Sequence, residues 1–200
     1  MPIILASKSP RRSELLKSLG WKFEVIAPNI VENVILEEKP ADMVCRLAKE
    51  KAESVYKGHK NRWIIAADTV VAIDEKKFGK PGDEVEARDM ISTLQGRTHN
   101  VITGVSVISP SGSMLVSAEE TEVTFRKMTE NEIAVYIEQG ECMDKAGAYA
   151  IQDKGVLLVE KIKGCYFNVV GLPIYLLSTM LIKLGWTLVD QWGLNHESIN

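Results

Sequence analysis

The sequence predicts an α/β fold in which a mixed β-sheet is flanked by helices. Short apolar runs, typical of buried strands, alternate along the chain with segments of helical periodicity. Two long strand-like runs, residues 98–108 and 115–125, follow each other across the turn-forming residues 109–113 and predict an antiparallel pair. A chain of 200 residues suits one domain over residues 1–200, with or without two lobes.

Local signals define the first elements of the chain. Residues 3–6 are apolar and predict a buried strand. Ser9 and Pro10 open the next helix, because a serine hydroxyl can cap the free amides and a proline at the first position loses no hydrogen bond. Gly20 ends that helix, and the alternation over residues 22–26 predicts a second strand.

The middle of the chain continues the alternation of helix and strand. Residues 40–56 predict a helix, and the nearly all-apolar residues 63–73 predict a central strand. Asp83 and Glu86 have the spacing of a capping box, which places a helix start there. Gly96 stops this third helix before the two long strands begin.

The C-terminal half adds a polar sheet face and further elements. Polar and apolar residues alternate toward the end of the 115–125 run, so one face of that strand is expected to be wet. Residues 130–138 predict a helix, 155–162 a strand and 172–184 a final apolar helix.

Composition excludes several classes of protein. The formal net charge of −3 argues against a large non-specific nucleic-acid surface. No apolar segment approaches the length of a membrane span, and no signal peptide is recognised, so we expect a cytoplasmic protein without membrane contact. Cys45, Cys142 and Cys165 are odd in number and lack C-x-x-C spacing, which suggests neither disulfides nor a zinc site.

A cluster of hydroxyl and basic residues follows the first strand. Ser7, Ser9, Arg11 and Arg12 lie where a strand meets a helix N-terminus. Helix amides and the helix dipole favour an anion there, and guanidinium groups suit phosphate oxygens. The alternative is an ordinary helix cap with solvated arginines. Two positive charges in a first turn oppose the dipole, and a bound anion would remove that cost, so we favour a phosphate site.

Two charged residues interrupt apolar patterns elsewhere. Lys51 falls near the middle of the apolar stripe of the predicted helix 40–56, where snorkelling to solvent is harder than at an edge. Asp68 lies inside the apolar run 63–73, and a buried carboxylate must be paired, protonated or bound to a metal. The alternative for Asp68 is a turn cap at a strand end. A cleft that holds an anionic partner for Lys51, and a metal ligand or general base at Asp68, explain the patterns better.

Other candidates are weak when taken alone. Lys80 and Glu32 would each pass for a solvated surface residue. The segment 144–152 contains small residues that permit close approach of a ligand, and Gln152 could pair with a base edge. Without further support, a packed loop with an ion pair is the better interpretation of that segment. The chain contains neither a P-loop, a dinucleotide-binding G-x-G-x-x-G nor a G-x-S-x-G motif.

Taken in order, these segments resemble the Maf family of nucleotide pyrophosphatases, and the match covers nearly the whole chain. Seven motifs carry the resemblance: LASKSPRR at 5–12, RLAKEKA at 46–52, AADTVV at 66–71, GKP at 79–81, GRTHNVITGV at 96–105, DKAGAYAIQ at 144–152 and VVGLP at 169–173. The resemblance implies an elongated mixed sheet with helices on both sides, and two lobes around a central cleft. It also implies a homodimer.

The resemblance implies hydrolysis of a nucleoside triphosphate to a monophosphate and pyrophosphate, with Mg²⁺ as the divalent metal and Mn²⁺ as an alternative. Asp68 would be the proton acceptor, Glu32 and Lys51 would complete the catalytic set, and Glu32 and Asp68 would bind the metal. The substrate-binding residues would be Ser7, Ser9, Arg11, Arg12, Thr69, Lys80, Asp144, Lys145 and Gln152. Among these, Arg11, Thr69 and Gln152 match positions linked with substrate choice.

The segment 144–152 resembles the branch of the family that acts on dTTP and UTP, with modified pyrimidine nucleotides as a further option. Cys142 stands where many relatives have proline, and we expect it to be a packing residue rather than a nucleophile. Ala150 stands where many have glycine, which puts the fine substrate preference in question. Two alternatives are a nucleotide-binding regulator of septum formation and cell division, and a pyrophosphatase for a methylated purine nucleotide such as 7-methyl-GTP.

Overall fold

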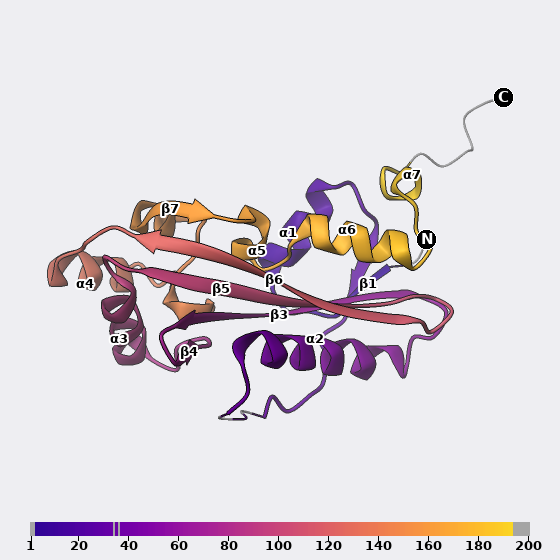
Figure 1. Ribbon diagram of the computed structural model, residues 1–200, viewed down its shortest axis with the longest axis horizontal. Coiled ribbons are helices and arrows are strands. Elements are labelled where there is room, and N and C mark those ends of the chain that lie inside the picture. Colours follow the sequence, from indigo (N-terminus) through magenta and orange to yellow (C-terminus); the bar gives the residue numbers. More distant parts are fainter. Residues whose placement is uncertain (1–2, 34, 36, 194–200) are drawn as a thin grey trace. The chain divides into compact units, whose positions relative to one another are not determined.

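The computed structural model describes residues 3–33, 35 and 37–193. Helices and strands alternate along the chain, as expected for an α/β protein (Figure 1). The elements are β1 (Ile3–Leu5), α1 (Pro10–Ser18), β2 (Phe23–Val25), α2 (Pro40–Tyr56), β3 (Trp63–Ile73), β4 (Lys76–Phe78), α3 (Glu84–Leu94), β5 (Thr98–Ile108), β6 (Met114–Phe125), α4 (Glu130–Glu138), η1 (Ala146–Ala148), η2 (Asp153–Leu158), β7 (Val159–Lys163), α5 (Tyr166–Val170), α6 (Ile174–Lys183) and α7 (Leu188–Gln191).

The strands form a mixed sheet in the order β2-β1-β3-β5-β6-β7, with β4 paired to β3 outside this path. β1 pairs in parallel with β2 and with β3, whereas β4 and β7 pair antiparallel with β3 and β6. A turn joins β5 to β6, with hydrogen bonds from the Ser109 amide to the Ser113 carbonyl (2.9 Å) and from the Gly112 amide to the Ser109 carbonyl (2.9 Å). The predicted fold class and the long hairpin are therefore confirmed.

The chain divides into two compact units. Unit 1 contains Met1–Asp68, Gly104–Ala118 and Gly171–Asn200, and unit 2 contains Thr69–Thr103 and Glu119–Val170. The division falls within β3, β5 and β6, between Asp68 and Thr69 in the first of these strands. A two-part organisation agrees with the expectation of two lobes, while the central cleft stays a prediction.

In unit 1, α2 lies along one face of the strands, and α1 and α6 lie along the other (Figure 1). The apolar stripe of α2 packs on the apolar strands through a core cluster that includes Ile4, Ala52, Val55 and Ile64. α2 passes so close to β5 that a Cβ atom on Gly104 would lie 2.3 Å from the Val44 carbonyl oxygen. A side chain at position 104 would therefore displace the helix that carries Lys51.

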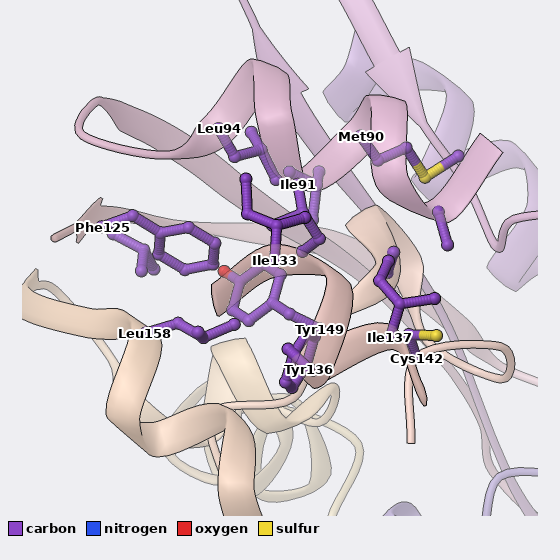
Figure 2. Packing of buried hydrophobic residues seen from close by; sticks show 14 of the residues in the cluster. Met90, Ile91, Leu94, Phe125, Ile133, Tyr136, Ile137, Cys142, Tyr149 and Leu158 are labelled. Carbon is purple, nitrogen blue, oxygen red and sulfur yellow. The ribbon is translucent and has the colours of Figure 1, made fainter. Parts of the chain in front are cut away.

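Unit 2 has its own core, shown in Figure 2. α3 and α4 pack beside each other, and their apolar faces meet the aromatic rings of Phe125 and Tyr149. Thr129 and Glu132 form a capping box at the start of α4. Cys142 is fully buried in this cluster, as expected for a packing residue.

Several boundaries differ from the prediction for physical reasons. Residues 153–158 form the 3₁₀ helix η2, so the predicted strand 155–162 begins only at Val159, and the apolar Val156 and Leu157 point to solvent. The predicted helix 172–184 begins at Ile174, because Pro173 occupies its N-cap position. The strand β4 and the short helices α5 and α7 were not predicted, since each is three to five residues long.

The predicted capping box at α3 is only half correct. The Asp83 side chain accepts a hydrogen bond from the Glu86 amide (2.8 Å), as expected for an N-cap. The Glu86 carboxylate accepts instead from the Gly82 amide (2.7 Å), one residue earlier than a capping box requires.

Outside positions 34, 36 and the chain ends, no helix combines the length and hydropathy of a membrane span.

Candidate active site

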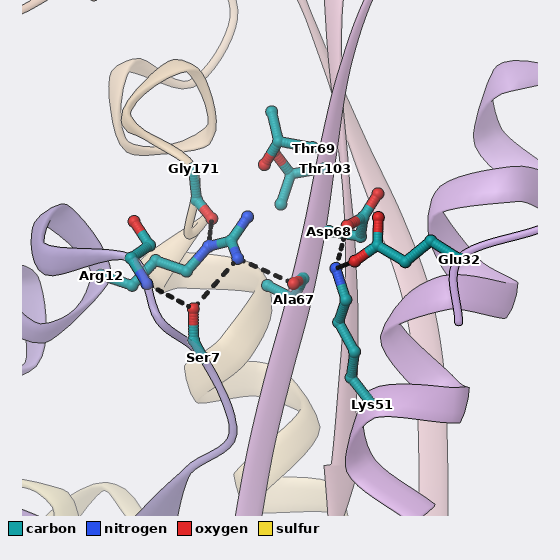
Figure 3. Close-up of polar contacts among 10 residues, drawn as sticks. Ser7, Arg12, Glu32, Lys51, Ala67, Asp68, Thr69, Thr103 and Gly171 are labelled. Carbon is teal, nitrogen blue, oxygen red and sulfur yellow. Dashed lines mark hydrogen bonds and ion pairs between the residues drawn. The ribbon is translucent and has the colours of Figure 1, made fainter. Parts of the chain in front are cut away.

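Arg12 in the first turn of α1 is held by oxygen atoms from three parts of unit 1. Its Nε donates to the Gly171 carbonyl (2.7 Å), and its Nη1 donates to the Ala67 carbonyl (2.8 Å) and to Ser7 Oγ (3.3 Å) (Figure 3). Burial lowers the pKa of Arg12 to about 10, and the negative charge of Asp68 opposes this shift. The guanidinium therefore stays charged at neutral pH and has a fixed position.

The cap expected from Ser9 is absent. The structure gives α1 no side-chain cap, so the prediction that the Ser9 hydroxyl binds the first amides is wrong. The buried hydroxyl of Ser7 accepts from the Ser9 amide (3.1 Å), just before the helix, and from Arg12. A serine two residues before the N-cap position thus fixes both the entering chain and the arginine.

Arg11 presents a different situation from Arg12. Its Nη1 atom is buried and has no hydrogen-bond partner among the described residues. Buried donors of a charged group are normally satisfied, and leaving one unpaired costs about 1–3 kcal/mol. An unsatisfied guanidinium at a helix N-terminus is the arrangement expected where an anionic ligand supplies the missing oxygen.

Lys51 lies among the buried apolar side chains of α2, as the sequence predicts. Its side chain is only 12% exposed, and its Nζ contacts both Glu32 Oε1 (2.7 Å) and Asp68 Oδ1 (2.5 Å) (Figure 3). The expected anionic partner is therefore two carboxylates of the protein itself. One ammonium bridges a strand residue and a loop residue and brings the two carboxylates to one place.

Asp68 and Glu32 approach Lys51 from different environments. The Asp68 side chain, within β3, is 13% exposed, whereas the Glu32 side chain, in the loop between β2 and α2, is 53% exposed. Two carboxylates around one ammonium leave a net negative charge, and both raise the pKa of the nearby Arg12 against the effect of burial. The ion pair with Lys51 satisfies the Asp68 carboxylate, and the role of Asp68 as metal ligand or general base stays a prediction.

The two carboxylates supply hard oxygen donors, the type that Mg²⁺ prefers, and each retains an oxygen that Lys51 does not contact in the described bonds. Within the described residues, no group of three or more His, Cys, Asp or Glu side chains could hold a metal ion. Mg²⁺ commonly needs only one or two protein carboxylates, with water and substrate oxygens completing its shell. The donor set therefore fits a Mg²⁺ ion shared with a substrate.

In unit 2, Thr69 joins a buried polar chain that the sequence did not predict. Its Oγ1 contacts Thr103 Oγ1 (2.9 Å), and the Thr103 hydroxyl donates to the Asn168 carbonyl (3.1 Å). The fully buried Asn168 side chain donates to the Val101 carbonyl (2.9 Å) and to Thr121 Oγ1 (3.0 Å). An asparagine among the apolar residues 166–170 was the available signal.

The loop of Lys80 and the segment 144–152 are connected in unit 2. The Gly147 amide donates to the Gly79 carbonyl (3.0 Å), and Gly147 adopts a left-handed φ of 67° at a place where a Cβ atom would lie 2.8 Å from Val71 Cγ2. Asp144 and Lys145 form an ion pair (2.6 Å), as the packed-loop interpretation expected. Lys80 is exposed, and Gln152 is half-buried at the start of η2.

The family model described as Maf-like protein matches residues 2–184. The chain belongs to the Maf family. It is similar to proteins named dTTP/UTP pyrophosphatase from Dictyoglomus thermophilum (48% identity, 94% of this chain and 98% of that one), Carboxydothermus hydrogenoformans (49%, 93% and 100%) and Thermoanaerobacter sp. (52%, 90% and 95%). A solved HAM1 protein from Coxiella burnetii shares 12% identity with a TM-score of 0.48, covering 92% of this chain and 99% of that one.

The Maf chain thus assembles part of the predicted site in each unit. Unit 1 brings together Ser7, Arg12, Glu32, Lys51 and Asp68, with Ser9 bonded to Ser7 and Arg11 next in the chain to Arg12. Unit 2 connects the loop of Lys80 to the segment that carries Asp144, Lys145 and Gln152, and it holds Thr69 on Thr103. That all these residues serve one substrate stays a prediction.

Proposed function

We propose that this Maf protein hydrolyses dTTP and UTP, or modified forms of these nucleotides, to a nucleoside monophosphate and pyrophosphate. Relatives that carry the name dTTP/UTP pyrophosphatase align over nearly their whole length and support the substrate class. The observation that carries the proposal is the placement of the Lys51 ammonium between the Glu32 and Asp68 carboxylates, beside the buried guanidinium of Arg12.

The reaction needs a positioned water and charge compensation for the triphosphate. The water oxygen attacks the α-phosphorus, the bond to the oxygen that bridges the α- and β-phosphates breaks, and pyrophosphate leaves. Asp68 accepts the proton of the attacking water, while Lys51 balances the charge of the two carboxylates. Arg11, Arg12 and Lys80 stabilise the phosphate oxygens, with Ser7 and Ser9 shaping the same anion site.

Glu32 and Asp68 would hold a divalent ion, with Mg²⁺ preferred for its affinity for carboxylate oxygens and Mn²⁺ as the alternative. When bound, this ion supplies a Lewis acid for the phosphate oxygens. Thr69, Asp144, Lys145 and Gln152 would bind the nucleoside part, with Gln152 and Thr69 contributing to base selection. We also propose that the single-domain chains form a homodimer, which light scattering of the purified protein tests. We propose no nucleic-acid partner.

The test is pyrophosphate release from dTTP and UTP by purified protein with Mg²⁺. Asp68→Asn should lose most of kcat, about 10²–10⁴-fold as expected for a general base, and should keep the wild-type unfolding midpoint within a few degrees. Asp74→Asn is the matched control, because Asp74 directly follows β3 and is exposed in an ion pair with Arg97. An active Asp68→Asn enzyme would remove Asp68 from the catalytic role.

A panel of triphosphates separates the remaining alternatives. A pure regulator would bind dTTP without releasing pyrophosphate, and a methylated-purine enzyme would turn over 7-methyl-GTP faster than dTTP. We expect dTTP and UTP to be the best substrates, since a pocket built to pair with one base edge leaves polar groups unpaired on another. Equal turnover of all triphosphates would contradict the assigned base selection.

A further inference from the structure

Glu32 lies in a loop without regular secondary structure, yet its carboxylate has a defined partner. Between β2 and α2 the described residues form no helix or strand, and the backbone bond described between two residues of this loop joins the Glu38 amide to the Ile35 carbonyl (3.3 Å). A loop of this length has many accessible conformations, so holding one carboxylate on the Lys51 ammonium requires anchoring from outside the loop.

Arg46 of α2 provides that anchoring through three hydrogen bonds to the loop, and a fourth holds its side chain on α2. Its Nε and Nη2 donate to the two carboxylate oxygens of Glu38 (2.8 and 2.6 Å), and its Nη2 also donates to the Asn33 carbonyl (3.1 Å). Its Nη1 donates to Glu50 (3.2 Å), one turn further along α2. The paired bonds to Glu38 raise the pKa of Arg46 above its ordinary value.

This network differs from a common surface ion pair. A single exposed pair contributes little, but a two-point arginine–carboxylate contact fixes the direction as well as the distance of its partner. The Arg46 side chain is 23% exposed and the Glu38 side chain 13% exposed, so solvent competes only partly. Arg46 thus holds the loop at Asn33 and at Glu38, and Asn33 lies one residue after Glu32.

We propose that Arg46 is a positioning residue for Glu32, acting through the loop 27–39. Arg46 and Lys51 belong to the same rigid helix, about 7.5 Å apart along its axis at 1.5 Å per residue. The loop is therefore attached to α2 at two points. The Asn33 carbonyl and the Glu38 carboxylate bind Arg46, and the Glu32 carboxylate binds Lys51. The relation to catalysis rests on the proposed function.

The first experiment needs no substrate. Hydrogen exchange followed by mass spectrometry compares wild type with Arg46→Gln and Arg46→Lys in the ligand-free protein. We expect exchange in residues 27–39 to rise about tenfold in Arg46→Gln, and to rise in Arg46→Lys as well, because an ammonium cannot make the two-point contact. Unchanged exchange in the loop would overturn the proposal.

Arg62→Gln is the matched control. Arg62 directly precedes β3, is 25% exposed, pairs with Glu24 (2.7 Å) and donates to the Ile3 carbonyl (3.4 Å). Its replacement should leave exchange in residues 27–39 and pyrophosphate release unchanged. If Arg62→Gln loosened the loop as much as Arg46→Gln, the effect would be general destabilisation and the proposal would fail.

A double-mutant cycle tests the link to Glu32. Arg46→Gln should lower kcat/KM for dTTP on the order of tenfold in the wild-type background, but less than about twofold when Glu32→Gln is already present. Equal losses in the two backgrounds would show that Arg46 does not act through Glu32. A wild-type protein that releases no pyrophosphate would contradict the proposed function instead, and the exchange data would still decide the role of Arg46.

Discussion

Two groups of polar side chains, one in each unit, show how differently charged and neutral partners are accommodated. In unit 1, Lys51, Glu32 and Asp68 are ionisable groups of opposite sign in direct contact, and Glu32 remains half exposed. In unit 2, His99 and Tyr149 are buried and share one hydrogen bond between Nε2 and the phenol oxygen (2.8 Å).

The electrostatics of the two groups follow from their surroundings. Burial lowers the pKa of His99 to about 4 and raises the pKa of Tyr149, so both side chains are neutral at pH 7. Phe125 meets both rings edge-on, with centroids 4.9 Å from His99 and 4.6 Å from Tyr149. The deep core of unit 2 thus keeps a neutral polar pair for packing, whereas unit 1 keeps its charges where partners and solvent can reach them.

Among the variants that test this comparison, removal of the central cation of unit 1 should have the largest effect. Lys51→Met should lower kcat/KM for dTTP about 10²–10³-fold, since it removes a fixed charge and leaves two carboxylates facing each other. Lys49→Met is the control on the same helix, because Lys49 is half exposed and lies 3.9 Å from Glu53. Steady-state pyrophosphate release measures kcat/KM for both variants. If Lys49→Met lowered kcat/KM as much as Lys51→Met, Lys51 would have no special role among the lysines of α2.

Acid should act on the neutral pair of unit 2. The folded-state pKa of His99 lies below the unfolded value of about 6.5, so the unfolded chain binds a proton that the fold excludes. The contribution of neutral His99 to the free energy of unfolding is complete above about pH 6.5 and is lost as the pH falls to about 4. The loss is roughly 3 kcal/mol in total, of which about 2 kcal/mol has occurred by pH 5. Urea unfolding at pH 7 and pH 5, followed by tryptophan fluorescence, measures this loss.

Variants assign the acid effect to one histidine. His99→Gln should reduce the difference in unfolding free energy between pH 7 and pH 5, because its side chain does not titrate. His59→Gln should retain the wild-type difference, since His59 lies outside the unit 2 core. If His99→Gln lost as much stability on acidification as wild type, the buried pair would not be the acid-sensitive element.

The smallest expected effect separates two threonine pairs of similar geometry. Thr69 and Thr103 are 2.9 Å apart at Oγ1 with Thr103 buried, whereas Thr98 and Thr124 are 2.8 Å apart at the surface. Thr103→Val should cost about 1–3 kcal/mol of unfolding free energy, because the Asn168 carbonyl and Thr69 lose a buried partner. Thr98→Val should stay within about 0.5 kcal/mol.

Thr103→Ser completes this test, since it keeps the hydroxyl and removes only a methyl group. It should recover part of the stability that Thr103→Val loses in urea unfolding at pH 7. Equal unfolding free energies for Thr103→Val and Thr98→Val would show that burial does not distinguish the two pairs.

The sequence alone determined the alternation of strands and helices, the long hairpin and the residues that break apolar patterns. Lys51 and Asp68 could be singled out because charge inside an apolar stripe or strand demands a partner. Arg11 and Arg12 could be singled out because positive charge in a first turn opposes the helix dipole. These signals are local, so periodicity is sufficient to reveal them.

Only the tertiary structure decided which partners satisfy that demand. It paired Lys51 with both Glu32 and Asp68, left α1 without the side-chain cap expected from Ser9, and revealed Arg46 as the anchor of the Glu32 loop. It also placed the apolar residues 155–158 in a 3₁₀ helix rather than in a strand. Such outcomes depend on contacts between residues far apart in the chain, and the spacing of residues along one element carries no information about them.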